Sequence, residues 1–311
     1  MTRLLAIRLS ALGDVIHTIP AVVALREALP DVEIGWVVES PYRELVSIVA
    51  GVEAIPVSMK RWGRSPLRFR REMRAARSAI RTYEVAVDFQ GLIKSAALAG
   101  FSRARERWGF DREAIREKAA LLFTNRRAAI DPSRHIVEQN LDLAAAVAGV
   151  PLLPMPEVDF TPFAADPDGS LAPFRGAVVL LPGAGKSEKQ WPAENFREVA
   201  RLIGERSLVV WGPGEEDLAS AIGAPMAPRT NLRQLAHVLA AARAVIGGDT
   251  GPLHLAAALG RPVVGLYGPT SPRRNGPYGQ IGRCVSTFES TRSMADIAVK
   301  DVMKKVEEVL A

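Results

Sequence analysis

Short apolar runs alternate with segments of helical period along the first half of the chain. Runs of strand length occupy residues 4–9, 33–38 and 85–89. Apolar residues recur at helical spacing over residues 15–29 and 135–148, and a basic helix is expected over 67–82. Strands that alternate with helices are typical of a parallel sheet with helices on both faces, so the pattern predicts an α/β fold.

The second half repeats this alternation after a proline-rich segment. Six prolines lie between Pro151 and Pro173, and proline disrupts the interior of helices and sheets, so 151–173 is expected to be a linker. Strands are expected at 177–181, 208–211, 244–246 and 263–267, and helices near 193–204, 231–242, 252–259 and 293–310. Two such units predict two Rossmann-like, doubly wound parallel-sheet domains that face a cleft.

The composition argues against a membrane-spanning, secreted or disulfide-bonded protein. The 311 residues are 48% hydrophobic, which is enough for one large or two medium domains, and no apolar run reaches the length of a membrane-spanning helix. Arg8 and Asp14 interrupt the apolar N-terminal stretch, so no signal peptide is expected. Cys284 is the only cysteine, which excludes an internal disulfide and favours a reducing, cytoplasmic location.

The positive charge of the chain is unevenly placed. The formal net charge is +6, and residues 60–81 hold nine lysines and arginines against one acid, Glu72. Such a cluster favours an anionic partner, which is a nucleic acid, an acidic membrane surface or an acidic substrate. For any single arginine, a solvated helix face is the alternative interpretation.

The segment 247–272 has the strongest ligand-binding pattern in the chain. The sequence GGDTG at 247–251 makes a tight turn after an apolar run, and Pro252 suits the first turn of a helix. A helix that begins there directs free N–H groups and a partial positive charge at the space above the turn. The turn therefore predicts a phosphate site, with an ordinary βαβ crossover as the alternative.

Asp14 follows the first expected strand, at the end where open α/β sheets place their ligands. The sequence SALGD at 10–14 does not match GxGxxG, so a dinucleotide site is not supported. General base and helix cap are both open roles for Asp14. A base would benefit from a pKa raised by burial.

A glycine-rich loop, PGAGKS at 182–187, follows the expected strand 177–181. It lacks the P-loop spacing, because Leu180 stands where the pattern needs glycine. Lys186 and Lys189 nevertheless follow a strand, and either is a candidate to neutralise a diphosphate.

Two acidic motifs differ in their expected role. In the turn 211–216, Glu215 and Glu216 are candidates to accept hydrogen bonds from a ribose, although acids at a helix start also interact favourably with the helix dipole. Asp166 and Asp168 have the spacing of a short metal-binding motif, but they lie in the linker. No metal site is expected.

A set of short motifs runs nearly end to end through the chain. They are SALGDVIHT at 10–18, WVVE at 36–39, IPV at 55–57, KRW at 60–62, DFQGLIKSA at 88–96, KQWP at 189–192, WG at 211–212, DTG at 249–251, His254, and YGPT at 267–270. In this order they resemble the heptosyltransferases of glycosyltransferase family 9, which act in lipopolysaccharide inner-core synthesis.

The resemblance implies the GT-B fold. It implies an acceptor-binding Rossmann-like domain at 1–160, a nucleotide-sugar-binding domain at 174–290, and a C-terminal helical segment at 291–311 that packs back on the first domain. The implied donor is ADP-L-glycero-D-manno-heptose and the implied acceptor is anionic Kdo-lipid A. The expected transfer is inverting and needs no metal or cofactor. The expected location is the cytoplasmic face of the inner membrane, with peripheral attachment and no nucleic-acid partner.

The resemblance also implies a role for individual residues. Asp14 is the expected catalytic base. The expected donor-binding residues are Lys189, Glu215 or Glu216, Asp249, Thr250, Gly251 and His254. The expected acceptor-binding residues are Lys60, Arg61, Arg64, Gln90, Lys94 and Arg126.

Three alternatives to this activity are considered. The first is heptosyltransferase II or another family 9 transferase that uses a different nucleotide sugar. The second is a GT-B-fold sugar epimerase, which would act on a nucleotide sugar without an acceptor. The third is a basic nucleic-acid-binding protein, although few aromatic residues interleave with the arginines of 60–81.

Overall fold

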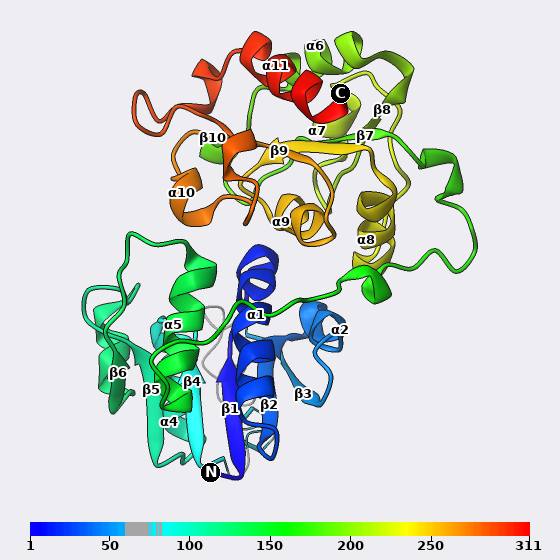
Figure 1. The fold of residues 1–311 in the computed structure, drawn as a ribbon. Coiled ribbons are helices and arrows are strands. Elements are labelled where there is room, and N and C mark those ends of the chain that lie inside the picture. Colours follow the sequence, from blue (N-terminus) through cyan, green and yellow to red (C-terminus); the bar gives the residue numbers. More distant parts are fainter. Residues whose placement is uncertain (60–73, 75, 79, 81–82) are drawn as a thin grey trace. The chain divides into compact units, whose positions relative to one another are not determined.

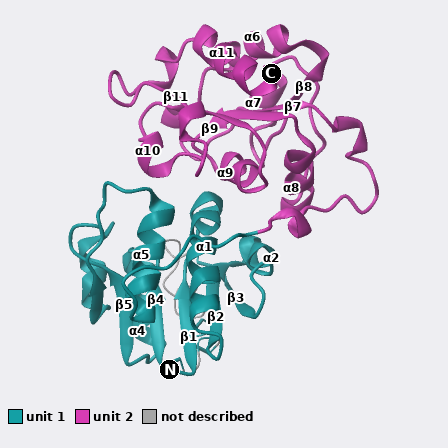
Figure 2. Ribbon diagram, viewed as in Figure 1, with its two compact units in different colours: residues 1–158 teal, residues 159–311 magenta. Residues whose placement is uncertain are grey.

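The computed structural model describes residues 1–59, 74, 76–78, 80 and 83–311 (Figure 1). The chain divides into two compact units, Met1–Val158 and Asp159–Ala311 (Figure 2). The division falls inside the proline-rich segment 151–173. Among the described residues, no helix is both long and apolar enough to cross a membrane.

Unit 1 is built on a six-stranded parallel sheet with the order β3-β2-β1-β4-β5-β6. This is the strand order of the Rossmann fold, which reverses direction between β1 and β4. The strands are β1 (Arg3–Ile7), β2 (Glu33–Glu39), β3 (Val52–Val57), β4 (Val85–Asp88), β5 (Glu106–Phe110) and β6 (Arg126–Ala128). The helices are α1 (Leu12–Ala28), α2 (Arg43–Val46), α4 (Ile93–Phe101) and α5 (Ile136–Ala148).

Helices cover both faces of this sheet. Side chains alternate along a strand, so Leu5 and Ile7 of β1 join one core cluster, which also includes Leu98 of α4. Leu4 and Ala6, which are also fully buried, point to the opposite face. There α1 and α5 pack against each other (Figure 1). Because both faces are covered, the central strands are almost entirely apolar.

Unit 2 has a five-stranded parallel sheet with the order β11-β10-β9-β7-β8. Counted within the unit, this is the flavodoxin-like order 2-1-3-4-5, which reverses between β7 and β9. The strands are β7 (Val178–Leu181), β8 (Ser207–Val209), β9 (Ala244–Gly248), β10 (Val263–Tyr267) and β11 (Val285–Ser286). The helices are α6 (Ala193–Ile203), α7 (Glu216–Ser220), α8 (Leu232–Ala241), α9 (Gly251–Ala258), α10 (Pro272–Asn275) and α11 (Val299–Leu310).

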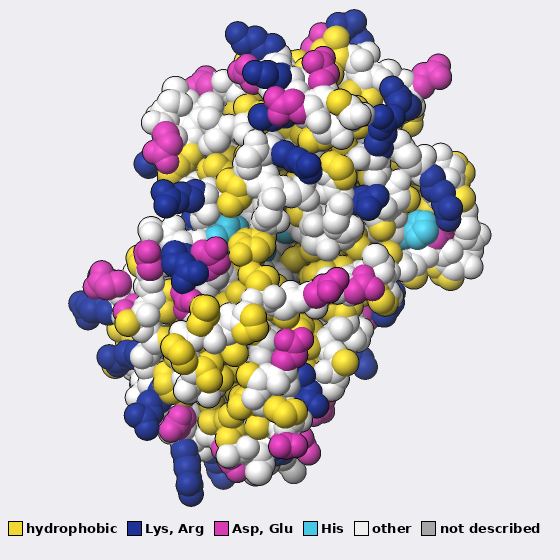
Figure 3. Space-filling model, viewed as in Figure 1, with side chains coloured by type: hydrophobic (Ala, Val, Ile, Leu, Met, Phe, Trp, Pro, Cys, Tyr) yellow, Lys and Arg dark blue, Asp and Glu magenta, His cyan; other side chains and the backbone are white. Residues whose placement is uncertain are grey.

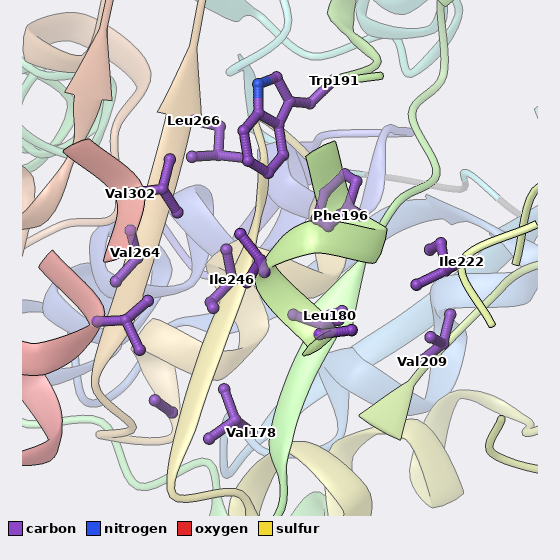
Figure 4. Close-up of a cluster of buried hydrophobic side chains, with 14 of the residues drawn as sticks. Val178, Leu180, Trp191, Phe196, Val209, Ile222, Ile246, Val264, Leu266 and Val302 are labelled. Atoms are coloured by element: carbon purple, nitrogen blue, oxygen red, sulfur yellow. The ribbon is translucent and has the colours of Figure 1, made fainter. Parts of the chain in front are cut away.

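A large aromatic pair anchors one core of unit 2 (Figure 4). The rings of Trp191 and Phe196 meet edge to face with centroids 5.0 Å apart, a favourable aromatic geometry. The indole N–H of Trp191 donates to the carbonyl of Ile297 at 3.0 Å, so its buried polar atom is satisfied. This bond ties the start of α6 to the segment that leads into α11.

Helix α11 packs against the sheet of unit 2. Val302 and Val306, one helical turn apart, belong to the core of unit 2, and α11 contacts α6, β9, β10 and β11 of the same unit. The two valines form the apolar stripe that this helix buries.

Candidate active site

Polar side chains gather at the point of strand-order reversal in each sheet. In open α/β sheets, ligands bind outside the carboxyl ends of the strands at such a point. In unit 1, Asp14 follows β1 and Gln90 follows β4. In unit 2, Lys189 follows β7 and Asp249 follows β9. Each unit therefore has a candidate site where its topology favours one.

The unit 2 site is centred on the carboxylate of Asp249. Nζ of Lys189 lies 2.7 Å from Asp249 Oδ2, and Nε2 of His254 lies 3.1 Å from Asp249 Oδ1. All three side chains are largely buried. Burial opposes ionisation of Asp249, but the His254 and Lys189 side chains more than offset it and lower the pKa of Asp249 to about 2. The cluster therefore holds an ionised carboxylate with its cation at the end of β9.

Thr250 and Gly251 lie where α9 begins. Thr250 is the N-cap residue, but its side chain makes no capping hydrogen bond. Its Oγ1 is buried and has no hydrogen-bond partner in the described part of the chain. The first N–H groups of a helix have no partner within the helix, so an anion above Gly251 would meet unsatisfied donors. A buried hydroxyl without a partner is costly, and it indicates a ligand contact.

Close backbone approach explains the glycine at the end of β9. A Cβ atom on Gly248 would lie 3.1 Å from the carbonyl oxygen of Lys189. Any larger residue would push the Lys189 backbone away from β9. The glycine thus permits the close approach of the Lys189 backbone to β9.

The two glutamates of the turn after β8 are distinguished by their surroundings. Glu215 Oε2 accepts from the backbone N–H of Gly212 at 2.7 Å. A Cβ atom on Gly183 would lie 2.1 Å from the Glu215 carboxylate, so this carboxylate lies over the loop that follows β7. Glu216 is exposed in the first turn of α7. The geometry therefore favours Glu215 as the acid at this site.

The other charged motifs of unit 2 contact residues that are near to them in the sequence. Lys186 is 70% exposed and lies 3.4 Å from Glu188, so of the two lysines only Lys189 contacts Asp249. Asp166 accepts from the backbone N–H of Leu171, and Asp168 accepts from that of Ser170. Both aspartates thus stabilise turns of the linker. Across the described residues, no group of three or more His, Cys, Asp or Glu side chains is placed to hold a metal ion.

The unit 1 site is centred on Asp14, whose side chain is 30% exposed. Asp14 Oδ1 lies 2.7 Å from Nη2 of Arg8, and Oδ2 lies 3.7 Å from Nη1 of Arg116. Oδ2 also accepts from the backbone N–H of Ala11 at 3.2 Å. Asp14 therefore supports the start of α1 and keeps part of its carboxylate accessible, so both roles considered for it are compatible.

The pKa of Asp14 differs from the expectation of a burial-raised value. Burial alone would raise it, but Arg8, Arg116 and the Ala11 N–H outweigh burial and hold the pKa of Asp14 below its usual range. Two positive charges near one carboxylate favour its ionised form. Asp14 is therefore a carboxylate that remains ionised at neutral pH.

Gln90 and Lys94 follow β4. Gln90 is buried, and its Oε1 accepts from the backbone N–H of Leu9 at 2.9 Å, which joins the ends of β1 and β4. Lys94 lies half-buried in the first turn of α4. Asp88, the last residue of β4, is buried, and burial raises its pKa to about 6 even though the backbone N–H groups of Gln90 and Gly91 oppose this.

The expected acceptor-binding cations are only partly brought to this edge. Arg126 begins β6, pairs in register with Trp108 in the middle of β5, and lies 3.3 Å from Glu106. Arg116, which belongs to none of the sequence motifs, is the exposed arginine that reaches Asp14. Lys60, Arg61 and Arg64 lie outside the described residues, as does most of the expected helix 67–82. On the face shown in Figure 3, lysine and arginine side chains of the described residues are dispersed over the surface.

The chain is similar to known proteins over most of its length. The chain matches the family model described as glycosyltransferase family 9 (heptosyltransferase) over residues 67–306. It is 35% identical over 293 residues to lipopolysaccharide heptosyltransferase 1 of Escherichia coli (strain K12), a match that covers 89% of this chain and 91% of that protein. The structure is similar to that of E. coli heptosyltransferase WaaC with ADP, with a TM-score of 0.84, 31% identity, and 99% of this chain and 100% of that one covered. It is similar to WaaC with ADP-2-deoxy-2-fluoro heptose at a TM-score of 0.81, with 31% identity and 99% of each chain covered.

Two Rossmann-like units in one chain, together with the match to WaaC, define a glycosyltransferase of the GT-B fold. Within that class, the chain belongs to glycosyltransferase family 9, the heptosyltransferases.

Proposed function

We propose that this protein transfers L-glycero-D-manno-heptose from ADP-heptose to Kdo-lipid A, with inversion at the anomeric carbon and without a metal ion. The observation that carries the donor assignment is the cluster of Lys189, Asp249 and His254 beside the N-terminus of α9. The E. coli relative with ADP and with an ADP-heptose analogue supports the same donor class.

The donor groups have complementary roles in this proposal. Lys189 and the N–H groups at the start of α9 neutralise the diphosphate. The unpartnered hydroxyl of Thr250 donates to a phosphate or sugar oxygen, while Asp249 and His254 orient Lys189 and the sugar. Glu215 accepts hydrogen bonds from the ribose hydroxyls. The departing ADP is thus stabilised by charges that the protein itself provides, which is the support for a metal-independent reaction.

Asp14 is the general base of the proposed reaction. Its Oδ2 accepts the proton of an acceptor hydroxyl as that oxygen forms a bond to the anomeric carbon. The bond from the anomeric carbon to the phosphate oxygen breaks, and ADP leaves with the electron pair. An oxocarbenium-like transition state draws electron density from the attacking oxygen, so the hydroxyl becomes acidic enough for an ionised carboxylate of low pKa.

Basic residues match the charge of the proposed acceptor. Kdo and lipid A carry carboxylates and phosphates, and Arg116 is exposed beside Asp14. Lys60, Arg61 and Arg64 remain proposed acceptor contacts from the sequence, together with Gln90, Lys94 and Arg126. We place the protein at the cytoplasmic face of the inner membrane, because its proposed acceptor is a lipid.

The test is a substrate panel with purified protein. ADP-heptose and other nucleotide sugars are each incubated with Kdo-lipid A, with and without a chelator, and the product linkage is assigned by NMR. Transfer from ADP-heptose with inverted configuration and unchanged rate in the chelator is the expected result. Turnover only with another nucleotide sugar, loss of rate in the chelator, or consumption of donor without acceptor would each contradict part of the proposal.

A further inference from the structure

A buried guanidinium supports the carboxylate of Asp14. Arg8 is 1% exposed, directly after β1, and its Nη2 lies 2.7 Å from Asp14 Oδ1. Its Nη1 donates to the backbone carbonyl of Phe89, directly after β4. A single side chain thus connects the carboxylate at the start of α1 to both strands at the point where the strand order of unit 1 reverses.

The backbone of Arg8 is as firmly fixed as its side chain. Its N–H donates to the carbonyl of Val37 at 3.2 Å, and its own carbonyl accepts from the indole N–H of Trp36 at 3.2 Å. Asp88 is close enough for the charge of Arg8 to affect its ionisation. The guanidinium therefore has little freedom to move away from Asp14.

Arg8 is an unfavourable residue for packing alone. A buried charge costs several kcal/mol in desolvation, and a well-packed apolar residue is often as stable in its place. The Arg8 Nε atom is buried and has no hydrogen-bond partner among the described residues, which adds to that cost. An apolar side chain would continue the apolar β1 without this penalty. The retained charge indicates a role at the carboxylate.

We infer that Arg8 is a positioning residue for catalysis, which fixes Asp14 through Oδ1 and presents Oδ2 to the acceptor hydroxyl. This inference deepens the proposed function and depends on its assignment of Asp14 as base. A planar guanidinium suits this task because its fork contacts Asp14 and the Phe89 carbonyl at the same time.

The groups that face Asp14 have different roles. Arg8 approaches Oδ1 from the end of β1, whereas Arg116 approaches Oδ2 from the loop after β5 at 3.7 Å. Arg116 is 51% exposed, so its side chain is free to turn toward an anionic acceptor, while Arg8 is not. The Ala11 N–H completes the described groups around the carboxylate. Without Arg8, the pKa of Asp14 would rise, because burial would be opposed mainly by an exposed arginine.

Arg8→Gln and Arg8→Lys test this inference in the full chain, with Arg105→Gln as control. Arg105 is exposed just before β5, at the amino end of that strand, whereas Asp14 lies beyond the carboxyl end of β1. The measurements are kcat and KM for both substrates, the pH profile of kcat, and the Kd for ADP. Thermal melting reports folding.

For Arg8→Gln we expect kcat to fall roughly 100-fold, with the acid limb of its pH profile moved upward by about one pH unit or more. The Kd for ADP should stay within about twofold, because the donor groups belong to unit 2. Arg8→Lys keeps the charge but loses the planar guanidinium that contacts Asp14 and the Phe89 carbonyl at the same time. We therefore expect about a 3–10-fold loss of kcat and little movement of the acid limb of the pH profile. Arg105→Gln should match the wild type.

Wild-type kcat in Arg8→Lys would overturn the inference, as would equal losses in both variants with an unmoved acid limb. If Arg8→Gln does not fold, the kcat of folded Arg8→Lys at unchanged ADP affinity still decides. Asp14→Asn separates the two claims. If Asp14→Asn is inactive while both Arg8 variants are normal, only the role of Arg8 fails. If Asp14→Asn turns over normally, the proposed base fails as well.

Discussion

Nζ of Lys189 lies 2.7 Å from Oδ2 of Asp249, although the two residues are 60 positions apart in the sequence. The contact joins the loop after β7 to the end of β9, the two strands between which the order of the unit 2 sheet reverses. It keeps an ammonium group beside the first turn of α9. In the proposed reaction, this ammonium meets the negative charge of the leaving ADP.

Replacement of Lys189 by methionine should therefore weaken ADP binding. A charge-assisted contact contributes about 1.5–3 kcal/mol, so we expect roughly a 10–100-fold rise in the Kd for ADP by isothermal titration calorimetry. Lys186→Met is the matched control, because Lys186 lies three residues away on the surface. Equal effects of the two substitutions would argue against the assignment of Lys189.

Thr250→Val should affect stability and binding in opposite directions. The substitution removes a buried hydroxyl that has no partner and makes no capping bond, so the free energy of unfolding without ligand should be unchanged or higher by about 1 kcal/mol. Affinity for ADP-heptose should fall, because the ligand loses a donor. Urea unfolding and calorimetry measure the two effects. A large loss of stability in the ligand-free variant would mean that the hydroxyl is needed by the fold.

Glu215→Gln and Glu216→Gln should separate the two candidate ribose acceptors. Glu215 lies against the loops after β7 and β8, whereas Glu216 is exposed. We expect Glu215→Gln to raise the Kd for ADP about tenfold, and Glu216→Gln to leave it within about twofold. Affinity for inorganic pyrophosphate, which has no ribose, should be unaffected by either. The reverse order of effects would assign the ribose contact to Glu216.

Asp88 should make stability depend on pH. Burial raises its pKa to about 6 from an unfolded value near 3.8, so its favourable contribution is complete below pH 4 and is lost as pH rises through 6. Asp88→Asn does not ionise. The unfolding free energy of this variant relative to the wild type should therefore rise between pH 4 and 7, by on the order of 2 kcal/mol. A difference that is constant over this range would contradict the assignment.

The buried strands of both sheets could be predicted because they are continuous apolar runs. β1, β2, β4, β7, β8, β9 and β10 lie within a few residues of the predicted positions. The strands β3, β5, β6 and β11 have no counterpart among the predicted strands. Glu53, Glu106 and Arg126 give the first three a mixed, partly exposed pattern, and β11 has only two residues. The apolar pattern predicts that the first helix begins at Val15, but α1 begins three residues earlier, at Leu12. Asp14 therefore lies in the first helical turn and not in the loop before it.

The sites were harder to predict than the fold. Motif resemblance indicates Lys189 and His254 together with Asp249, but for Asp14 it does not indicate which charged groups surround the carboxylate. Arg8 interrupts an apolar run and gives no sign that it reaches a carbonyl 81 residues away. Arg116 lies in an irregular loop that has no periodic pattern, so only the structure brings it to Asp14. The direction of the pKa shift of Asp14 follows from these two arginines and could not be derived from the sequence.

In the proposed reaction, Asp14 is the base for heptosyl transfer from ADP-heptose to Kdo-lipid A. Single-turnover transfer by the wild type and by Asp14→Asn, followed by mass spectrometry of the lipid, tests it most directly. Asparagine keeps an oxygen for the contact with Arg8, so the variant should fold and bind ADP normally. We predict transfer by the wild type and a rate about 10²–10⁴-fold lower in the variant. A variant that transfers heptose at the wild-type rate would show that Asp14 is not the base, and a wild type that transfers none would show that the substrates are different.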